Sequence, residues 1–177
     1  MLSLLRHAKS DWGENVRRDF DRPLNARGRA ASERMAKFFA ANEFDPDLVL
    51  VSPARRTMET LDIISRTCPW ARAAVPDDAL YMITLDELLG KVRDLPNMHD
   101  HVLIVGHNPG LEQLAAEIAA PNSISHDDAA MARLRSRFAT GALAEFDCHI
   151  DKWKDMAPRT ASLRRFTKPK DLRSGRG

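Results

Sequence analysis

The stretch His101-Val-Leu-Ile-Val-Gly-His-Asn-Pro109 decides the class of fold. The aliphatic run at 101–105 is typical of a strand that is buried on both faces. Asn108 and Pro109 then suit the N-cap and the first position of a helix, and apolar residues continue beyond them at helical spacing. A buried strand that leads through a short turn into a helix is the repeating unit of an α/β fold.

The same unit is repeated on the N-terminal side of this stretch. Short apolar runs at 2–5 and 47–51 end in polar residues, and each precedes a helical pattern. The helix expected at 26–41 has Asn25 as its N-cap, and the helix after the second run is expected to end near Ser65.

Further strands and helices are expected before and after the strand at 101–105 in the sequence. A short strand near 73–75 is expected before a helix that Thr84 caps, with Glu87 in the capping-box position. The remaining expected elements are a helix at about 127–138 and two strands, at 142–147 and 162–167. This alternation predicts a three-layer α/β/α sandwich with a mostly parallel central sheet. No linker or repeat interrupts it, so residues 1–177 are expected to form a single domain with a flexible basic tail at about 173–177.

Composition agrees with an ordinary globular protein and argues against several classes. Hydrophobic residues make up 44% of the 177 residues and charged residues 29%, with a formal net charge of only +2. We expect no nucleic-acid partner, because aromatic residues that could stack on bases are sparse among the basic residues near the C-terminus. Cys68 and Cys148 form no CxxC pair, which argues against a disulfide scaffold. No apolar run approaches the ~20 residues that cross a bilayer. We therefore expect a cytoplasmic protein with no membrane partner, whose oligomeric state the sequence leaves open.

Side chains that carry chemistry gather where three of the expected strands end. They are Arg6, His7 and Ser10, then Ser52, Arg55 and Arg56, and finally Gly106, His107 and Asn108. Sheets of this kind place their sites outside the carboxyl ends of the strands, so these side chains are expected to meet. Arginine's planar fork matches phosphate oxygens and keeps its charge. Neighbouring positive charges lower the pKa of a histidine and favour the neutral imidazole, which is the nucleophilic form. The pattern therefore predicts a phosphate site with a histidine nucleophile.

Three motifs at these positions resemble the signatures of the histidine phosphatase superfamily. They are Leu5-Arg-His-Ala8, Ser52-Pro-Ala-Arg-Arg-Thr-Met-Glu-Thr60 and Val105-Gly-His-Asn108. Within that superfamily the chain is most similar to the small phosphohistidine phosphatases of the SixA type. The segments that carry this closer resemblance are Asp21-Arg-Pro-Leu-Asn-Ala-Arg-Gly28, Thr140-Gly-Ala-Leu-Ala144 and Pro169-Lys-Asp-Leu172. The resemblance extends from Leu2 to about Leu172.

The resemblance implies a role for several residues of the predicted site. His7 is implied as the nucleophile, Arg6 as a phosphate ligand and His107 as the second histidine. Arg22 is implied as an additional ligand that is particular to the small phosphohistidine phosphatases. No metal or other cofactor is implied, since arginines supply the positive charge.

The second motif contains two arginines, and the resemblance distinguishes them. The family's arginine lies four residues after the serine, so Arg56 is implied as the catalytic arginine and Arg55 as a surface residue or one behind the site. Ser10 and Asn108, which follow the same strand ends as the two histidines, are expected to contact the substrate.

The expected reaction has two in-line displacements. His7 attacks phosphorus, and water then attacks the phospho-His7 intermediate from the vacated side. We expect a backbone carbonyl to hold the other ring nitrogen of His7, because that fixes the tautomer with a free attacking nitrogen. The substrate is expected to be a phosphorylated protein or a small phosphate compound.

One feature of the larger superfamily members has no match here. Those enzymes use a carboxyl group between the second and third motifs as general acid, and Asp77, Asp78 and Glu87 lie there without a matching pattern. Asp11 and Asp19, which are nearer His7, are further candidates. Esters need such an acid more than phosphohistidine, whose leaving imidazole can already carry a proton, so its absence favours phosphohistidine on a protein.

Several alternatives remain open at this point. The chain is alternatively a phosphatase of small esters or nucleotides, or a silent module that binds phosphoproteins, although intact His7 and His107 argue against silence. A metal-dependent hydrolase would use His99 and His101, with His126 as a third ligand. A dinucleotide-binding enzyme is disfavoured, because no Gly-x-Gly-x-x-Gly motif follows the first strand.

Overall fold

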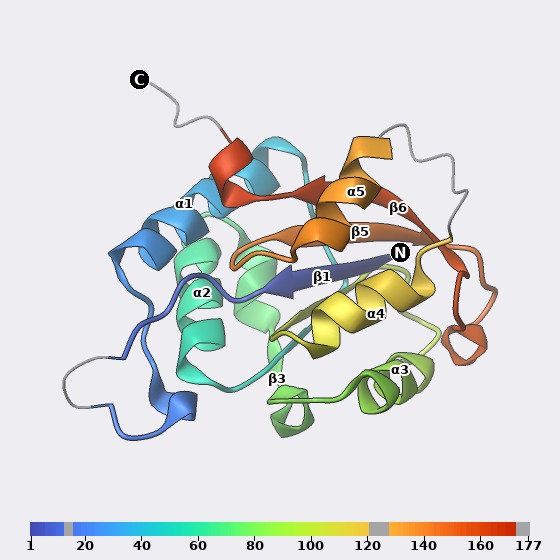
Figure 1. Cartoon of the computed structure of the whole chain (residues 1–177), viewed down its shortest axis with the longest axis horizontal. Coiled ribbons are helices and arrows are strands. Elements are labelled where there is room, and N and C mark those ends of the chain that lie inside the picture. Colours follow the sequence, from blue (N-terminus) through green and yellow to red (C-terminus); the bar gives the residue numbers. More distant parts are fainter. Residues whose placement is uncertain (13–15, 121–127, 173–177) are drawn as a thin grey trace.

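The computed structural model describes residues 1–12, 16–120 and 128–172. Within these ranges one mixed sheet has the strand order β3-β2-β4-β1-β5-β6, and helices surround it in Figure 1. The strands are β1 (Leu2–Arg6), β2 (Leu48–Val51), β3 (Val75–Pro76), β4 (Val102–Gly106), β5 (Leu143–Cys148) and β6 (Ala161–Thr167). The helices are α1 (Ala26–Ala41), α2 (Arg55–Ser65), α3 (Leu85–Arg93), α4 (Gly110–Ile118) and α5 (Asp128–Ser136).

The middle of the sheet is parallel. Strand β4 lies between β1 and β2 and pairs in parallel with both, and β3 extends this block from β2. Leu5 and Val51 both lie opposite Val105, so β1, β2 and β4 end at one level. Strands β5 and β6 continue the sheet beyond β1 in antiparallel pairing. The predicted mostly parallel α/β sheet is therefore confirmed.

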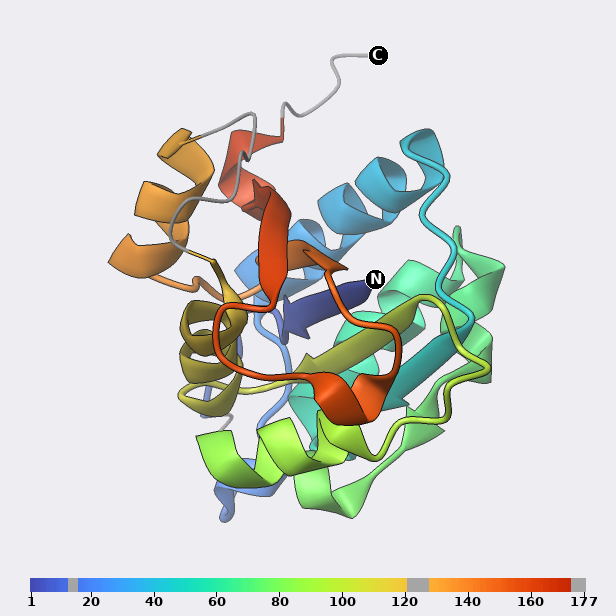
Figure 2. The same cartoon turned by 90° about the vertical axis from the view of Figure 1, so that its right-hand side faces the viewer.

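Helices cover both faces of the sheet. Alternate side chains of a strand point to opposite faces, so Leu103 and Val105 of β4 pack against α1 and α2, whereas Val102 and Ile104 pack against α3, α4 and α5. Figure 2 shows the two groups of helices on either side of the sheet. The predicted three-layer sandwich is confirmed, and β4 is buried along its whole length.

Two predicted helix starts are confirmed by their caps. The Asn25 side chain accepts a hydrogen bond from the backbone N–H of Gly28 at 2.9 Å, and α1 has the predicted bounds. Thr84 and Glu87 form the reciprocal capping box at the start of α3. Such caps satisfy N–H groups that the first helical turn leaves without partners.

The start of α4 differs from the prediction. Pro109, and not Asn108, is the N-cap, and the helix begins at Gly110. The side-chain amide of Asn108 instead donates to Glu112 Oε2 at 3.1 Å and to the carbonyl oxygen of Phe138 at 3.2 Å. The prediction was wrong because a tertiary contact uses the side chain that would otherwise cap the helix.

Two other predictions fall partly beyond what is described. The basic tail expected at 173–177 lies outside the described residues, as does the first residue of the helix expected at 127–138. None of the helices within the described ranges combines the length and the apolar character that a membrane span requires.

The first turn of α1 packs against the chain that follows β1. The backbone N–H of Asn25 donates to the carbonyl oxygen of Lys9 at 3.0 Å. A Cβ atom on Gly28 would lie 2.0 Å from that same oxygen. Glycine is therefore required for this close approach, which holds the segment after His7 against α1.

Replacing Gly28 by alanine should destabilise the protein, because the obstructing atom belongs to the backbone and cannot rotate away. We expect urea unfolding, followed by circular dichroism, to give a free energy of unfolding lower by more than ~1 kcal/mol. Gly90→Ala in α3 is the matched control, since its Cβ would meet no atom within 4 Å. That variant should be unchanged or more stable by ~0.5–1 kcal/mol. Equal stability of the two variants would contradict the close approach at Gly28.

Candidate active site

The aligned carboxyl ends of β1, β2 and β4 open into a cleft of about 300 Å³. Its walls are formed by Arg6, His7, Lys9, Ser10, Asp19, Arg22, Arg56, Met82, His107, Asn108 and Thr140. Of the residues expected to meet here, Ser52, Arg55 and Gly106 do not line the cleft. The residues predicted to be catalytic or to bind substrate all line it, and they are Arg6, His7, Ser10, Arg22, Arg56, His107 and Asn108. The structure thus brings the predicted residues together, and their individual roles stay predictions.

Backbone contacts hold His7 in place at the end of β1. Its backbone N–H donates to Gly106 O at 3.1 Å, and the residue is 7% exposed. Its Nδ1 atom lies 2.7 Å from Ala8 O, and a carbonyl only accepts, so Nδ1 carries the proton. Nε2 therefore has the lone pair, and Arg56 Nε–H donates to it at 3.3 Å. This is the tautomer that the sequence predicts.

Both imidazoles in the cleft are neutral near pH 7. Burial, together with the nearby His107, Arg56 and Arg6, lowers the pKa of His7 to about 3, and the hydrogen bond to Ala8 O opposes this shift. Burial, with Arg56 and Arg6, also lowers the pKa of His107 to about 3. The two ring centroids are 5.1 Å apart. A neutral imidazole keeps the lone pair that a nucleophile needs.

The two neighbouring arginines at the start of α2 have different surroundings. Arg56 is 4% exposed and reaches into the cleft. Arg55 points outward and pairs with Glu59 at 2.6 Å, with its side chain 55% exposed. The predicted register, with Arg56 in the site and Arg55 at the surface, agrees with these positions.

Asp19 joins two arginines of the cleft. Its Oδ1 accepts from Arg22 Nη1 at 2.9 Å, and its Oδ2 accepts from Arg56 Nη2 and from the hydroxyl of Tyr81, each at 2.9 Å. Burial opposes its ionisation, yet the hydrogen bonds from Arg22, Tyr81 and Arg56 lower the pKa of Asp19 to about 2. Asp19 is thus a carboxylate at neutral pH and not a proton donor.

Arg6 is held from the opposite wall. Its Nη1 donates to Phe138 O at 2.7 Å, and the backbone N–H of Phe138 donates to Glu112 Oε1 at 2.8 Å. Asn108 donates to the other carboxylate oxygen of Glu112. Glu112 therefore orients both Asn108 and the segment that holds Arg6.

His107 and Ser10 are each held by a contact with another segment of the chain. His107 Nε2 is hydrogen-bonded to Ser52 Oγ at 2.8 Å, so Nδ1 is the ring nitrogen without a protein partner. Ser10 is buried, and its backbone pairs with Leu24 in an isolated bridge. The bridge holds the loop that carries Asp19 and Arg22 beside the end of β1.

The remaining candidate acids have other positions. Asp77 pairs with Lys91 at 2.5 Å, and Glu87 caps α3. Among the described residues that line the cleft, Asp19 is the only carboxyl. From the sequence, Asp19 was a candidate general acid, whereas Tyr81 and Glu112 had no predicted role. Only Glu112 had a local signal, as it lies one helical turn after Asn108.

Several buried polar atoms of the described residues lack a hydrogen-bond partner. They are Arg6 Nε, Arg22 Nε, His107 Nδ1 and Asn108 Oδ1. All of them belong to residues that line the cleft. An unpaired buried polar group costs ~1–3 kcal/mol, and the arginine nitrogens among these atoms are donors. An oxyanion is the kind of ligand that supplies the missing acceptors.

The sequence and the fold now allow comparison with known proteins. The family model of the histidine phosphatase superfamily (branch 1) matches residues 2–94, just over half of the chain. The chain belongs to the histidine phosphatase superfamily. The predicted family is therefore confirmed.

Solved structures support a resemblance to one group of the superfamily. A structure from Agrobacterium tumefaciens, assigned as a phosphohistidine phosphatase SixA, is 32% identical, with 95% of this chain and 97% of that chain covered and a TM-score of 0.73. One from Nakamurella multipartitia with the same assignment is 29% identical, with 95% of each chain covered and a TM-score of 0.78. An uncharacterised chloroplastic protein of Arabidopsis thaliana is 45% identical over 60 residues, 34% of this chain, and the match spans 28% of that protein's length.

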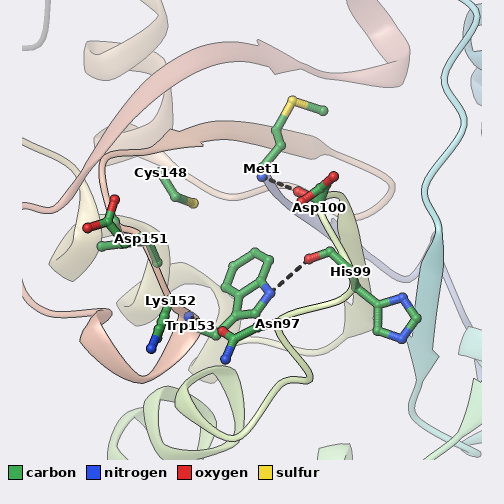
Figure 3. Close-up of a pocket in the computed structure, with 9 residues that line it drawn as sticks. Met1, Asn97, His99, Asp100, Cys148, Asp151, Lys152 and Trp153 are labelled. Atoms are coloured by element: carbon green, nitrogen blue, oxygen red, sulfur yellow. Dashed lines mark hydrogen bonds between the residues drawn. The ribbon is translucent and has the colours of Figure 1, made fainter.

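A smaller cavity of about 100 Å³ lies at the opposite, amino-terminal edge of β1 and β4. Figure 3 shows the indole of Trp153 in it, whose N–H donates to His99 O at 2.9 Å. The backbone N–H of Trp153 donates to Asn97 Oδ1 at 3.0 Å. These contacts attach the turn η4 (Trp153–Asp155) to the chain before β4.

The histidines considered for a metal site have separate partners. His101 Nε2 is 2.9 Å from Ser3 Oγ, whereas His99 Nδ1 is 3.4 Å from Asp47 Oδ1. The His99 ring points away from the cavity in Figure 3. His126 lies outside the described residues. Within those residues no group of three or more His, Cys, Asp or Glu side chains is placed to hold a metal ion.

Nuclear magnetic resonance should detect the two neutral imidazoles. The pKa values of about 3 in the folded protein lie below the ordinary histidine value of 6.5. The stability that the two neutral rings contribute is therefore present above pH 6.5 and is lost as the pH falls toward 3. We expect the ring nitrogens of His7 and His107 to show neutral imidazole from pH 7.5 to 5, with His7 protonated on Nδ1. Saturating phosphate should raise the pH at which protonation occurs. Protonation of the free protein with midpoints near 6.5 would contradict the burial of these rings.

Proposed function

We propose that this chain is a phosphatase that removes phosphate from phosphohistidine on a protein through a phospho-His7 intermediate. The observation that carries the proposal is the fixed His7 ring, which presents an unprotonated Nε2 to Arg56 Nε in a cleft where Arg6 Nε and Arg22 Nε are unpaired donors. A nucleophile with its lone pair directed at a guanidinium is suited to attack an anionic phosphoryl group.

In the first displacement, His7 Nε2 forms a bond to phosphorus as the bond from phosphorus to the substrate nitrogen breaks. The bonding electron pair leaves with the substrate imidazole, which already carries a proton on its other ring nitrogen and therefore departs as neutral histidine. Arg6, Arg22, Arg56 and His107 surround the transferring oxygens and balance their charge. In this step the hydrogen bond that Arg56 Nε–H donates to His7 Nε2 is replaced by one to a phosphate oxygen.

In the second displacement, water attacks phosphorus from the side that the leaving group vacated. The bond from phosphorus to His7 Nε2 breaks, the water contributes its hydroxyl to inorganic phosphate, and its proton passes to solvent or to the phosphate product. His7 then returns to the Nδ1-protonated form that Ala8 O holds. The arginines supply the positive charge in both steps.

The cleft favours a phosphoramidate over an ester. An alkoxide leaves phosphate readily only when an acid protonates it, and a positioned acid contributes ~10²–10⁴-fold. Asp19, the only carboxyl among the described residues of the cleft, is ionised. The imidazole of phosphohistidine depends less on such an acid, because it can already carry a proton when it leaves. The two structures at 32% and 29% identity that are assigned as phosphohistidine phosphatases support the same substrate class.

Arg56→Ala should lower kcat/KM far more than Arg55→Ala. Arg56 Nε lies at the attacking nitrogen, whereas Arg55 forms an exposed pair with Glu59. Loss of one preorganised donor at a transition state lowers the rate by ~10²–10³-fold. We expect that loss for Arg56→Ala and less than about twofold for Arg55→Ala, measured with a phosphoramidate substrate. Similar losses in both variants would show that the assignment of the arginines is wrong.

The intermediate should be trapped on His7. After rapid mixing with ³²P-labelled phosphohistidine protein and quenching in alkali, label should remain on the wild-type chain and be released by acid, because phosphoramidates are stable to base and labile in acid. His7→Ala should carry no label and show no turnover, with its circular dichroism unchanged.

The same assay distinguishes the substrate classes. With EDTA present, we expect turnover of phosphohistidine protein to exceed that of p-nitrophenyl phosphate and nucleoside monophosphates in kcat/KM. A preference for esters would favour the small-ester alternative. Acid-stable label, or label on His7→Ala, would remove the phosphohistidine intermediate from consideration.

A further inference from the structure

Asp19 connects three separate segments of the chain at the wall of the cleft. It lies in the turn η1 (Asp19–Asp21), in the loop after β1, and its carboxylate accepts hydrogen bonds from Arg22, Arg56 and Tyr81, each at 2.9 Å. Arg56 comes from α2, and Tyr81 precedes α3. Water alone can solvate a carboxylate at the surface, so three protein donors on this one indicate that it orients them.

The contacts to Arg56 determine where its third nitrogen points. Nη1 donates to the backbone oxygen of Asp19 at 2.6 Å, and Nη2 donates to Oδ2. The guanidinium is planar and rigid, so fixing both Nη atoms also fixes Nε. Nε faces His7 Nε2 at 3.3 Å, which is where the phosphoryl group would be transferred.

Asp19 also compensates charge in the cleft. Arg6, Arg22 and Arg56 all line it, and like charges at this separation repel each other. Asp19 bonds to Arg22 through one oxygen and to Arg56 through the other, which holds both guanidinium groups close together before any anion arrives. The lowered pKa of Asp19 agrees with a charge that is permanent at neutral pH.

Tyr81 extends the same network to the second histidine. Its hydroxyl donates to Asp19 Oδ2, and its ring packs edge-on against His107 with centroids 5.6 Å apart. The Arg56 guanidinium lies 5.9 Å from the centre of the Tyr81 ring. Asp19 therefore contacts Arg56 directly and is connected to His107 through Tyr81.

We propose that Asp19 is a positioning residue for phosphoryl transfer: it aims Arg56 and Arg22 at the phosphoryl group, and its negative charge limits the binding of phosphate as such. The inference rests on the proposed function. The orientation of the two arginines matters most in the transition state, whereas repulsion between the Asp19 carboxylate and phosphate acts on every bound phosphate. Removing Asp19 should therefore slow the chemical step without weakening phosphate binding.

The test compares Asp19→Asn with Asp21→Asn. Asp21 lies in the same turn but pairs with the exposed Arg18, outside the cleft. With N-phosphoimidazole as substrate, we expect Asp19→Asn to lower kcat at least about tenfold, and Asp21→Asn to stay within about twofold of wild type. The inhibition constant of inorganic phosphate should be unchanged or smaller in Asp19→Asn. An unchanged kcat, or a raised KM with unchanged kcat, would overturn the inference.

Binding of vanadate separates this inference from the proposed function, because it needs no turnover. Vanadate adopts a trigonal-bipyramidal form that resembles the transition state, so its affinity should fall in Asp19→Asn while that of phosphate does not. In an Arg56→Ala background the same substitution should have a smaller effect on vanadate, since Asp19 acts through Arg56. Fully additive losses would overturn the inference.

A second variant keeps the test decisive if Asp19→Asn does not fold. Tyr81→Phe removes one hydrogen bond to Asp19 and keeps the ring against His107. We expect kcat to fall by about threefold, as for the loss of one modest hydrogen bond, with phosphate inhibition unchanged. Wild-type kcat in a folded Tyr81→Phe variant would contradict the network. A wild-type protein without turnover would instead contradict the proposed function, and the vanadate comparison would still test Asp19.

Discussion

The in-register parallel pairing of β1 with β4 is the interaction on which the site depends. Leu5 lies opposite Val105 and Arg6 opposite Gly106, and the backbone N–H of His7 donates to Gly106 O. The pairing places His7 and His107 at the same level, with their rings 5.1 Å apart. A shift of one residue would turn every side chain of β1 to the other face of the sheet. The hydrophobic layers that fix this register therefore also fix the distance between the two imidazoles.

Without a bound anion, the cleft must hold several positively charged arginines close together. Burial keeps both imidazoles neutral, so the arginines are the permanent cations beside them. Carboxylates hold those arginines from behind: Asp19 bonds directly to Arg22 and Arg56, whereas Glu112 acts on Arg6 through the backbone of Phe138. The donors are thus oriented before an anion binds, which is the condition for electrostatic stabilisation of a transition state.

Local patterns in the sequence were enough for most elements and for the choice of site. The cap at Asn25, the capping box at Thr84 and the apolar runs of the strands are short-range features, and they predicted the corresponding elements to within a few residues. The start of α4 was wrong because Asn108 serves a tertiary contact with Phe138 that no local preference records. Asp19 was predicted only as a candidate general acid, since its partners Arg56 and Tyr81 lie 37 and 62 residues further along the chain. Strand order is equally non-local, so the position of β4 between β1 and β2 had no sequence signal.

That position of β4 has a consequence for the order in which the nascent chain can assemble. Strands β1 and β2 are made first, yet neither pairs with the other. Each has an edge that stays open until β4 is made, which ends at Gly106, although β2 can pair with the short β3 on its other edge before then. At synthesis rates of ~5–20 residues per second, the early strands spend several seconds with open edges. Unpaired edges of this kind are templates for association with other chains. Helices α1 and α2, which pack on each other and cover one face of these strands, are then the local structure available to shield them during that interval.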